Sequence, residues 1–348
     1  MSSPMPIRTA ILGFGVSGRV FHAPFIAANP AYSLNFISTS NVERIASVRD
    51  LYPETVVIAQ PMDVFDHADQ LDLVVLSTPP GTHYELAKAA IAHGLHVVID
   101  KPFVPRTDQA AELISLANAA DVTLTVFQNR RWDGDFLTLK KLVESGELGR
   151  VRTFESRFEW WKPQGFRDWK ATTSIAEGGG ILFDLGSHLI DQAIQLFGPV
   201  IKVHAETARH SGHTDADGDE EAFVSLVHES GTKSRLMMNG IAALNAPRFH
   251  VLGSEAGYTK WGLDGQEPAL IAGTLPTDSN YGLEAEETWG TFGVPGSTHR
   301  VPAERGAYDE FYALLATCLR EGGVPPIDPR DAAEVLRVIE LAHRAARA

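Results

Sequence analysis

Three side chains that can carry charge or exchange protons stand at positions that favour catalysis. Lys101 follows directly after an apolar, strand-like run that ends at Asp100, and Pro102 stiffens the exit. Ligands of open α/β sheets bind outside the carboxyl ends of the strands, so a lysine at such an end is directed to a site. Asp184 and His188 are four residues apart, so on a helix they would share one face, where a carboxylate can orient a proton-transferring imidazole. The alternatives are a solvated lysine, an Asp184 that caps a helix and a His188 that belongs to the core.

A glycine-rich turn between an apolar strand and a helix predicts a dinucleotide site. Glycines allow the tight turn and let the backbone approach a pyrophosphate, whose charge is favoured by the helix N-terminus. The same pattern also occurs where a helix simply packs closely on a strand. The turn consists of Gly13, Phe14, Gly15, Val16, Ser17 and Gly18.

The end of the second predicted strand indicates which nucleotide would bind. An NAD site carries an Asp or Glu there, which hydrogen-bonds to the ribose. This sequence has Ser38, Thr39 and Ser40 instead, and Arg44 follows. Hydroxyl groups and an arginine can bind a 2′-phosphate, so NADP is favoured over NAD. The alternative is that Arg44 is a solvated helix residue.

Two later strands of the same sheet end in loops that should face the nucleotide as well. Thr78, Pro79 and His83 follow one of them, and Lys101 follows the other. Because the carboxyl ends of parallel strands meet at one edge, we expect these residues to lie near the glycine-rich turn.

These residues require a parallel sheet to bring them together, and the first part of the chain predicts one. From Ile7 to about Gln128, apolar runs rich in β-branched residues alternate with amphipathic segments of helical length, as in a doubly wound α/β (Rossmann) fold. The predicted strands are Ile7–Leu12, Leu34–Ser38, Leu73–Ser77, His96–Ile99 and Val122–Phe127. The predicted helices are Gly18–Ala28, Val42–Asp50, His83–His93 and Asp108–Ala120.

After Gly149 the pattern changes to longer alternating segments, which predict an α+β domain with a large, mostly antiparallel open sheet. Its strands are expected at Arg152–Glu159, Ile201–Thr207, Glu221–His228, Lys233–Asn239 and Arg248–Gly253, with a helix at Asp184–Phe197. Residues 262–299 are expected to be long loops, and helices are expected at Ala307–Arg320 and Pro329–Ala346. The predicted domains are therefore 1–126, 127–326 and a C-terminal helix, 327–348, that packs back on the first domain.

Composition excludes several classes of partner. The 30 basic and 44 acidic residues give a net charge of −14, so the chain has no broad basic field for nucleic acid or an anionic membrane. Cys318 is the only cysteine, which excludes an internal disulfide and a zinc site with several thiolates. Residues 1–6 lack the pattern of a secretory signal and no apolar run reaches membrane-spanning length, so we expect a cytoplasmic protein.

A metal-like loop and a group of tryptophans are two further candidate sites. The loop 210–219 resembles a metal loop, but an EF-hand needs Gly at position six and Glu at position twelve. Here Gly218 is at position four and Leu226 is at position twelve, so no metal is expected. Trp132, Trp160, Trp161 and Trp169 lie within a short span, where they could stack on a sugar ring or belong to the core. Trp161 is kept as a candidate substrate contact.

As a set, these motifs resemble the glucose-fructose oxidoreductase/inositol dehydrogenase (Gfo/Idh/MocA) family, over nearly the whole chain. The matching segments are Gly13–Gly18, Thr78–Pro80 with His83 and Glu85, Gly94–Pro102, Asn129–Asp133, Gly180–Asp184, Gly186, His188–Asp191 and Pro325–Pro329. Within the family, Val20–Pro24, Asn129–Phe136 and Asp184–Gln192 look like the NADP-dependent scyllo-inositol dehydrogenases.

The resemblance implies roles for particular residues. The lysine of the family's E-K-P motif corresponds to Lys101, although this chain has Asp100 where the family usually has Glu. The D-x-G-x-H pair corresponds to Asp184 and His188. The same resemblance places Asn129 at the cofactor and substrate.

Arg130, Trp161, Asp184 and His188 are then expected to contact the substrate. The implied reaction transfers a hydride between a ring secondary alcohol of a cyclitol or sugar and NADP, with NAD as a second option. The alternatives are a nucleotide-binding sensor or regulator on the same fold, or a sugar dehydrogenase or keto-sugar reductase with another substrate.

A small polyol or sugar is thus the expected ligand, and a second copy of the chain the expected partner. An antiparallel sheet with few helices can be covered on only one face, and Phe223, Leu226, Leu236 and Met238 suggest that the other face is partly apolar. Packing that face against its copy would give a homodimer or homotetramer.

Overall fold

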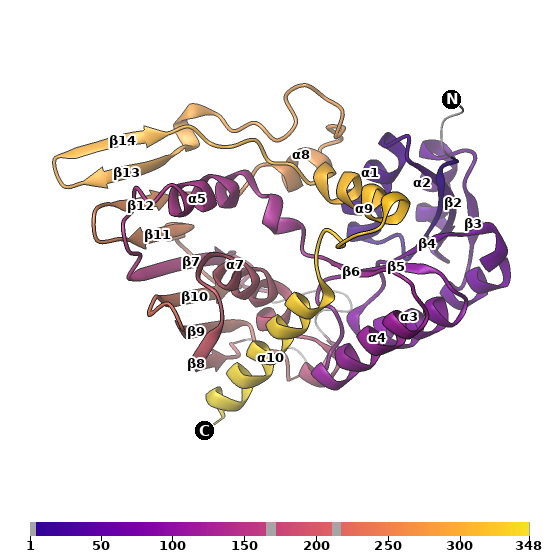
Figure 1. Cartoon of the computed structure of the whole chain (residues 1–348), viewed down its shortest axis with the longest axis horizontal. Coiled ribbons are helices and arrows are strands. Elements are labelled where there is room, and N and C mark those ends of the chain that lie inside the picture. Colours follow the sequence, from indigo (N-terminus) through magenta and orange to yellow (C-terminus); the bar gives the residue numbers. More distant parts are fainter. Residues whose placement is uncertain (1–4, 165–171, 211–216, 348) are drawn as a thin grey trace. The chain divides into compact units, whose positions relative to one another are not determined.

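The computed structural model describes residues 5–164, 172–210 and 217–347, which are drawn in colour in Figure 1. The chain forms two compact units. The first comprises residues 1–128, 267–281 and 308–333, and the second comprises residues 129–266, 282–307 and 334–348. Each unit is therefore built from segments that are far apart in the sequence. Trp169 and most of the metal-like loop 210–219 lie outside the described residues.

The first unit contains the predicted parallel sheet. Its six strands have the order β3-β2-β1-β4-β5-β6, and every neighbouring pair is parallel. The strands are β1 (Ile7–Leu12), β2 (Tyr32–Ser38), β3 (Val56–Ile58), β4 (Leu73–Leu76), β5 (His96–Asp100) and β6 (Leu124–Phe127). The helices between them are α1 (Ala23–Ala28), α2 (Val42–Leu51), α3 (His83–Ala92) and α4 (Thr107–Ala119). The doubly wound fold is confirmed.

The core of this unit depends on a helix from the far end of the chain. Strands β4, β5 and β6 are almost fully buried, as parallel strands covered on both faces require. Helix α9 (Asp309–Glu321) adds Phe311, whose ring meets that of Phe127 at a centroid distance of 4.8 Å. The C-terminal segment therefore completes the core around the end of β6.

The second unit contains the predicted open sheet, with eight strands in the order β14-β13-β12-β11-β7-β10-β9-β8. The strands are β7 (Thr153–Glu159), β8 (Val200–Ala208), β9 (Glu221–His228), β10 (Lys233–Asn239), β11 (Phe249–Leu252), β12 (Gly257–Lys260), β13 (Gly290–Val294) and β14 (Ser297–Val301). Only the β7–β10 pair is parallel, so the sheet is mostly antiparallel as predicted. Helices α5 (Gly134–Glu144) and α7 (Ser187–Phe197) belong to this unit, and α10 (Pro329–Ala346) ends in it.

The expectation of long loops at residues 262–299 was wrong. The segment holds α8 (Gln266–Ile271), strand β13 and the start of β14. Strand β14 is almost fully exposed and β13 is rich in glycine, so neither sequence alternates apolar and polar residues as a half-buried strand does. Pairing of β13 with β12 and of β14 with β13 makes them strands, and a pairing partner cannot be read from their own residues.

The apolar residues expected on the uncovered face of the sheet also needed correction. Leu226, Leu236 and Met238 are completely buried. Met238 approaches Gly186 in the helical segment that covers the sheet, so these side chains face the helices. Phe223 and Met237 are paired across β9 and β10, and both are half-buried on the opposite face. Side chains alternate between the two faces along a strand, so Phe223 and Leu226, three residues apart on β9, lie on opposite faces. The register pairs Phe223 with Met237, so Leu236 and Met238 also lie on the face opposite Phe223.

None of the helices in the described ranges has both the length and the apolar character that crossing a membrane requires.

Adjacent methionines on β10 provide a test of these two faces. We expect Met238→Asp to lower the free energy of unfolding by more than about 3 kcal/mol, because it buries an unpaired charge beneath a helix. Met237→Asp should cost less than about 1 kcal/mol in the monomer, because the carboxylate can reach water. Urea denaturation of both variants measures the difference, and similar losses would show that the faces are assigned wrongly.

Candidate active site

The glycine-rich turn has the geometry that a dinucleotide needs. Gly13 has a φ of +95°, and a Cβ there would lie 2.5 Å from the Ser77 carbonyl oxygen. A Cβ on Gly18 would lie 2.2 Å from the Gly13 carbonyl oxygen, so strand and helix pack too closely for any side chain. A Cβ on Gly15, by contrast, would meet no atom of the described residues within 4 Å. The backbone at Gly15 is therefore open to a ligand, whereas the other two glycines serve the turn and the packing.

The remaining residues of the turn face in different directions. Phe14 is buried and its ring packs edge-on against Tyr52, so this side chain belongs to the core. Val16 is exposed and Ser17 is half-buried.

The end of β2 carries hydroxyl residues and no carboxylate, and the cationic Arg44 follows on α2. Ser38 and Thr39 are buried, whereas Ser40 and Arg44 are exposed. The Asn41 side chain accepts a hydrogen bond from the Arg44 backbone N–H at 3.0 Å and caps α2. This cap places Arg44 in the first turn of α2, which follows the carboxyl end of β2, and Ser40 is the exposed hydroxyl residue at that end.

The loops after β4 and β5 end at the same edge of the sheet, because β1, β4 and β5 are parallel neighbours in that order. Thr78 and Lys101 are half-buried there, and Pro79 is exposed. The structure thus brings the predicted nucleotide residues of the first unit to one edge.

His83 is placed beneath this edge and is completely buried. Its Nε2 atom is 2.9 Å from the Thr78 carbonyl oxygen, and its Nδ1 atom is 3.1 Å from the carbonyl oxygens of Pro102 and Phe103. Burial lowers the pKa of His83 despite these contacts and the charge of Asp100. The ring therefore ties the loop after β4 to the loop after β5.

In the second unit, Asp184 and His188 lie on one helical run. The run starts at Ile181, so Asp184 is inside it and the alternative of an N-cap is wrong. Residues 182–186 form a π-helical turn, which is a feature found frequently at functional sites, and α7 continues it. His188 is 4% exposed and Asp184 is half-buried.

The start of this helical run is fixed by Asp219, which the sequence did not single out. The Leu182 N–H donates to Asp219 Oδ2 at 3.0 Å, and the Ile181 N–H donates to the Asp219 backbone carbonyl at 2.8 Å. A Cβ on Gly180 would lie 2.0 Å from Asp219 Oδ1, so the glycine before the run leaves room for this carboxylate. A carboxylate at a helix N-terminus is also favoured by the helix dipole.

The segment that begins at Asn129 holds α7 from the side. Asn129 and Arg130 are buried, and the Arg130 carbonyl accepts a hydrogen bond from Gln192 Nε2 at 2.9 Å. Arg131 forms a bidentate pair with Asp191, with distances of 2.8 and 2.6 Å. Asp191 is one helical turn after His188, so this pair fixes the part of α7 that presents the imidazole.

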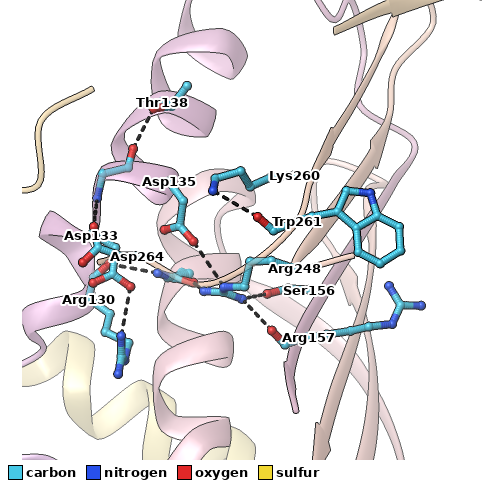
Figure 2. A network of polar contacts seen from close by, with 12 residues as sticks. Arg130, Asp133, Asp135, Thr138, Ser156, Arg157, Arg248, Lys260, Trp261 and Asp264 are labelled. Atoms are coloured by element: carbon cyan, nitrogen blue, oxygen red, sulfur yellow. Dashed lines mark hydrogen bonds and ion pairs between the residues drawn. The ribbon is translucent and has the colours of Figure 1, made fainter. Parts of the chain in front are cut away.

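A buried arginine joins α7 to the sheet, and Figure 2 shows its contacts with Asp135, Ser156 and Arg157. Arg248 donates to Ser156 Oγ at 2.5 Å and to Gln192 Oε1 at 2.8 Å, and its Nε atom is 3.4 Å from Asp135. Burial lowers the pKa of Arg248, an effect that the negative charges of Asp135 and then Asp133 oppose. Arg248 therefore connects β7, α5 and α7 through a single guanidinium group.

The start of α5 is held by a carboxylate from another segment, also drawn in Figure 2. Asp264 Oδ2 accepts a hydrogen bond from the Gly134 N–H at 2.8 Å, and Oδ1 accepts one from the Gln266 N–H at 2.8 Å. Burial, followed by the charge of Asp135, raises the pKa of Asp264 to about 6. Gln266 Nε2 also donates to the Trp132 carbonyl at 3.0 Å.

Trp161 lies just beyond β7, where it forms an isolated bridge with Ile241, and it is 59% exposed. Its role as a substrate contact stays a prediction.

The sequence also missed Asp219 and Arg248 as supports of the site. A signal for Arg248 was its place at the start of an apolar strand, but the sequence could not show which carboxylate would pair with it.

Comparisons with known proteins agree with this geometry. Residues 7–128 match an oxidoreductase family with an NAD-binding Rossmann fold, and residues 136–259 match the GFO/IDH/MocA C-terminal domain. The chain is 33% identical to scyllo-inositol 2-dehydrogenase (NADP(+)) IolW of Bacillus subtilis, over 97% of this chain and 92% of that protein. It is 36% identical to the oxidoreductase YdgJ of Escherichia coli, over 98% and 96%. The solved structure of the oxidoreductase yvaA from Bacillus subtilis superposes with a TM-score of 0.91 at 32% identity, covering 100% of this chain and 98% of that one.

The bidentate Arg131–Asp191 pair leads to a stability prediction. Lysine keeps the charge but cannot form two parallel bonds, so Arg131→Lys should lower the free energy of unfolding by about 1–3 kcal/mol. It should also speed amide hydrogen exchange in α7. Arg106→Lys is the matched control, because Arg106 pairs with Asp108 where both side chains are exposed, and its effect should stay within about 0.5 kcal/mol. Equal losses in the two variants would contradict a special role for the buried pair.

Proposed function

Because the chain belongs to the GFO/IDH/MocA family of oxidoreductases with an NAD-binding Rossmann fold, we propose that it is an NADP-dependent dehydrogenase acting on a ring CH–OH group. The proposed substrate is a cyclitol or sugar of the scyllo-inositol type. The observation that carries the proposal is the joint presence of an open glycine-rich turn, Lys101, and the Asp184 and His188 pair on one helical run. The likeness to IolW supports the substrate class.

The residues of the turn fit a dinucleotide. Gly15 leaves the backbone open, the π-helical segment Gly18–His22 leads into α1, and Lys101 follows β5 at the same edge of the sheet. Bound NADP would supply the hydride acceptor. The backbone of residues 13–18 would hold the pyrophosphate, and Ser40 with Arg44 would meet the 2′-phosphate.

Three side chains would handle the proton and the charge. His188 would accept the hydroxyl proton of the alcohol, and Asp184 would orient the imidazole. Lys101 would donate to the substrate oxygen and stabilise negative charge that develops there. In the reverse direction the same groups would return the proton to a keto sugar.

The same residues favour one of the alternatives. A sensor on this fold needs the nucleotide site but has no use for a base and a charge-stabilising lysine, so the three proton-handling residues favour an enzyme. A sugar dehydrogenase with a different substrate is the second candidate. It is favoured by a 27% identity with the D-apiose dehydrogenase of Paraburkholderia graminis, over 80% of this chain and 72% of that protein.

The proposal also covers location and assembly. A cytoplasmic location is proposed from the composition and the single cysteine. A homodimer or homotetramer is proposed through the sheet face that carries Phe223 and Met237, which are half-buried within one chain. Sedimentation of Met237→Asp against the wild-type protein would test that assembly.

A substrate screen tests the activity itself. Inositols, aldoses and their keto forms would be offered with NADP or NAD in both directions, and the absorbance of the reduced nicotinamide would be followed. Turnover of a cyclitol or sugar supports the proposal, and nucleotide binding without turnover of any of them would favour the sensor.

The choice of nucleotide depends on Arg44. We expect Arg44→Ala to weaken NADPH binding about tenfold or more, because it removes a charge-assisted bond to the 2′-phosphate, and to change NADH binding less than about twofold. Fluorescence titration with each nucleotide measures both constants. Equal losses for the two nucleotides, or a wild-type preference for NADH, would refute the assignment.

The proton-handling roles predict losses in turnover rather than in folding. Lys101→Ala should lower kcat by about 10²–10³, and His188→Ala by about 10²–10⁴, because both would act at the reacting carbon and oxygen. NADPH titration serves as the control, since both variants should still bind the nucleotide. A kcat close to that of the wild-type protein in either variant would remove that residue from the mechanism.

A further inference from the structure

The carboxylate that holds the start of the Asp184 and His188 helical run has one oxygen to spare. Asp219 is 4% exposed, and its Oδ2 atom accepts the Leu182 N–H at 3.0 Å. Its Oδ1 atom is buried and has no hydrogen-bond partner among the described residues. A carboxylate oxygen that is buried without a partner costs free energy, so a donor near Oδ1 would stabilise the whole cap.

A buried histidine of the C-terminal helix α10 faces this oxygen. His343 Nε2 lies 3.5 Å from Asp219 Oδ1, and the His343 side chain is 9% exposed. Within the described part of the chain this nitrogen has no hydrogen-bond partner either. An imidazole that carries its proton on Nε2 presents a donor to the carboxylate. At 3.5 Å the contact is longer than a typical hydrogen bond, so it acts by electrostatic attraction in a buried setting.

The place of His343 on α10 calls for such a partner. Buried residues recur every three or four positions along the helix, as on a face that packs against a core. In the described part of α10 the other members of this row are apolar: Ala332, Val335, Leu336, Val338, Ile339 and Ala342. An apolar side chain at position 343 would continue the row, whereas a buried imidazole costs free energy unless a polar group meets it. The Asp219 carboxylate is that group.

The same imidazole also contacts the helical run itself. The centroid of its ring lies 5.6 Å from that of the Phe183 ring, with an angle of 37° between the planes. Phe183 is buried, and it directly precedes Asp184. His343 therefore meets both the carboxylate that holds Leu182 and the residue beside Asp184.

These contacts determine how firmly the run is held. The last torsion of an aspartate side chain is soft, so a carboxylate bound through one oxygen can still turn. His343 restrains the second oxygen, and the carboxylate then keeps one orientation toward the Leu182 N–H. A helical run is stiff, so a shift at its start is passed on to Asp184 and His188. A displacement of about 1 Å at reacting groups can cost about 100-fold in rate.

We propose that His343 is a positioning residue. It fixes the Asp219 carboxylate and, through it, the start of the helical run, so the C-terminal helix sets the geometry of Asp184 and His188. This rests on the proposed function in that Asp184 and His188 handle the proton. The hold on the helical run itself can be measured without any substrate.

Two substitutions at position 343 separate the N–H donor from the volume of the side chain. Leucine fills a similar space without a donor, whereas the amide of glutamine can offer an N–H to Asp219 Oδ1. We expect His343→Leu to lower kcat about 5- to 30-fold and to change the Kd for NADPH less than about twofold, because the nucleotide turn is in the other unit. His343→Gln should keep at least about a third of the wild-type kcat.

Ile339→Ala supplies the matched control. Ile339 is completely buried one helical turn before His343 on α10, so its truncation should lower the melting temperature through lost packing. The kcat of the folded control should stay within about twofold of the wild-type value. A loss of kcat in Ile339→Ala as large as in His343→Leu, or no recovery with glutamine in a folded variant, would overturn the proposal.

A double-mutant cycle tests whether His343 acts through Asp219. Asp219→Ala removes the cap and should lower kcat about 10- to 100-fold. In that background His343→Leu should cost less than about twofold more, because its partner is already absent. Losses that multiply in full would overturn the route through Asp219. If the alanine variant does not fold, the exchange measurement on the position 343 variants decides.

Amide hydrogen exchange without substrate measures the hold on the helical run directly. The Leu182 N–H should exchange about fivefold or more faster in His343→Leu than in the wild-type protein, and near the wild-type rate in His343→Gln. Amides at the far end of α7 should keep their rates. Unchanged exchange of Leu182 in His343→Leu would overturn the proposal. If the wild-type protein turns over no substrate, the proposed function fails, while exchange still decides whether His343 holds the run.

Discussion

A charged side chain that leaves water must be paired, and this constraint shapes the surroundings of the helix that carries Asp184 and His188. Asp191 is buried and forms a bidentate ion pair with Arg131. Arg248 is buried and meets Asp135 together with neutral acceptors from two other elements. Each such contact has a narrow range of acceptable geometries, so satisfying it fixes the elements that carry the charges.

The consequence for the second unit is a helix held at several points. The helical run that carries Asp184 and His188 is fixed at its start by Asp219 and further along by Arg131 and by the Arg130 carbonyl, which accepts a hydrogen bond from Gln192. Apolar packing alone, such as Met238 beneath Gly186, would allow small shifts of the helix along the sheet. Polar contacts of defined direction do not, and a proton-transferring imidazole requires that accuracy.

The first unit applies the same constraint to loops. His83 joins the loops after β4 and β5 by contacts to backbone carbonyls, and Asp100 Oδ1 accepts a hydrogen bond from the Lys101 N–H at 2.7 Å. Loops at the edge of a parallel sheet are mobile unless something holds them. Here buried side chains hold them from below, so the exposed groups at the edge, such as Ser40 and Arg44, remain available to a ligand.

The sequence by itself determined the fold class, the glycine-rich turn and the helix of Asp184 and His188, because each leaves a local pattern. Buried parallel strands are continuously apolar, glycines mark the turn, and a helix has its own period. Strands β13 and β14, the face on which Met238 lies and the partners of Arg248 and Asp135 were decided only by the tertiary structure. An edge strand takes its conformation from its neighbour, and a side chain's face depends on register. A charge likewise finds its partner through contacts between segments that may be more than a hundred residues apart, such as Arg248 and Asp135, and no local pattern records such a contact.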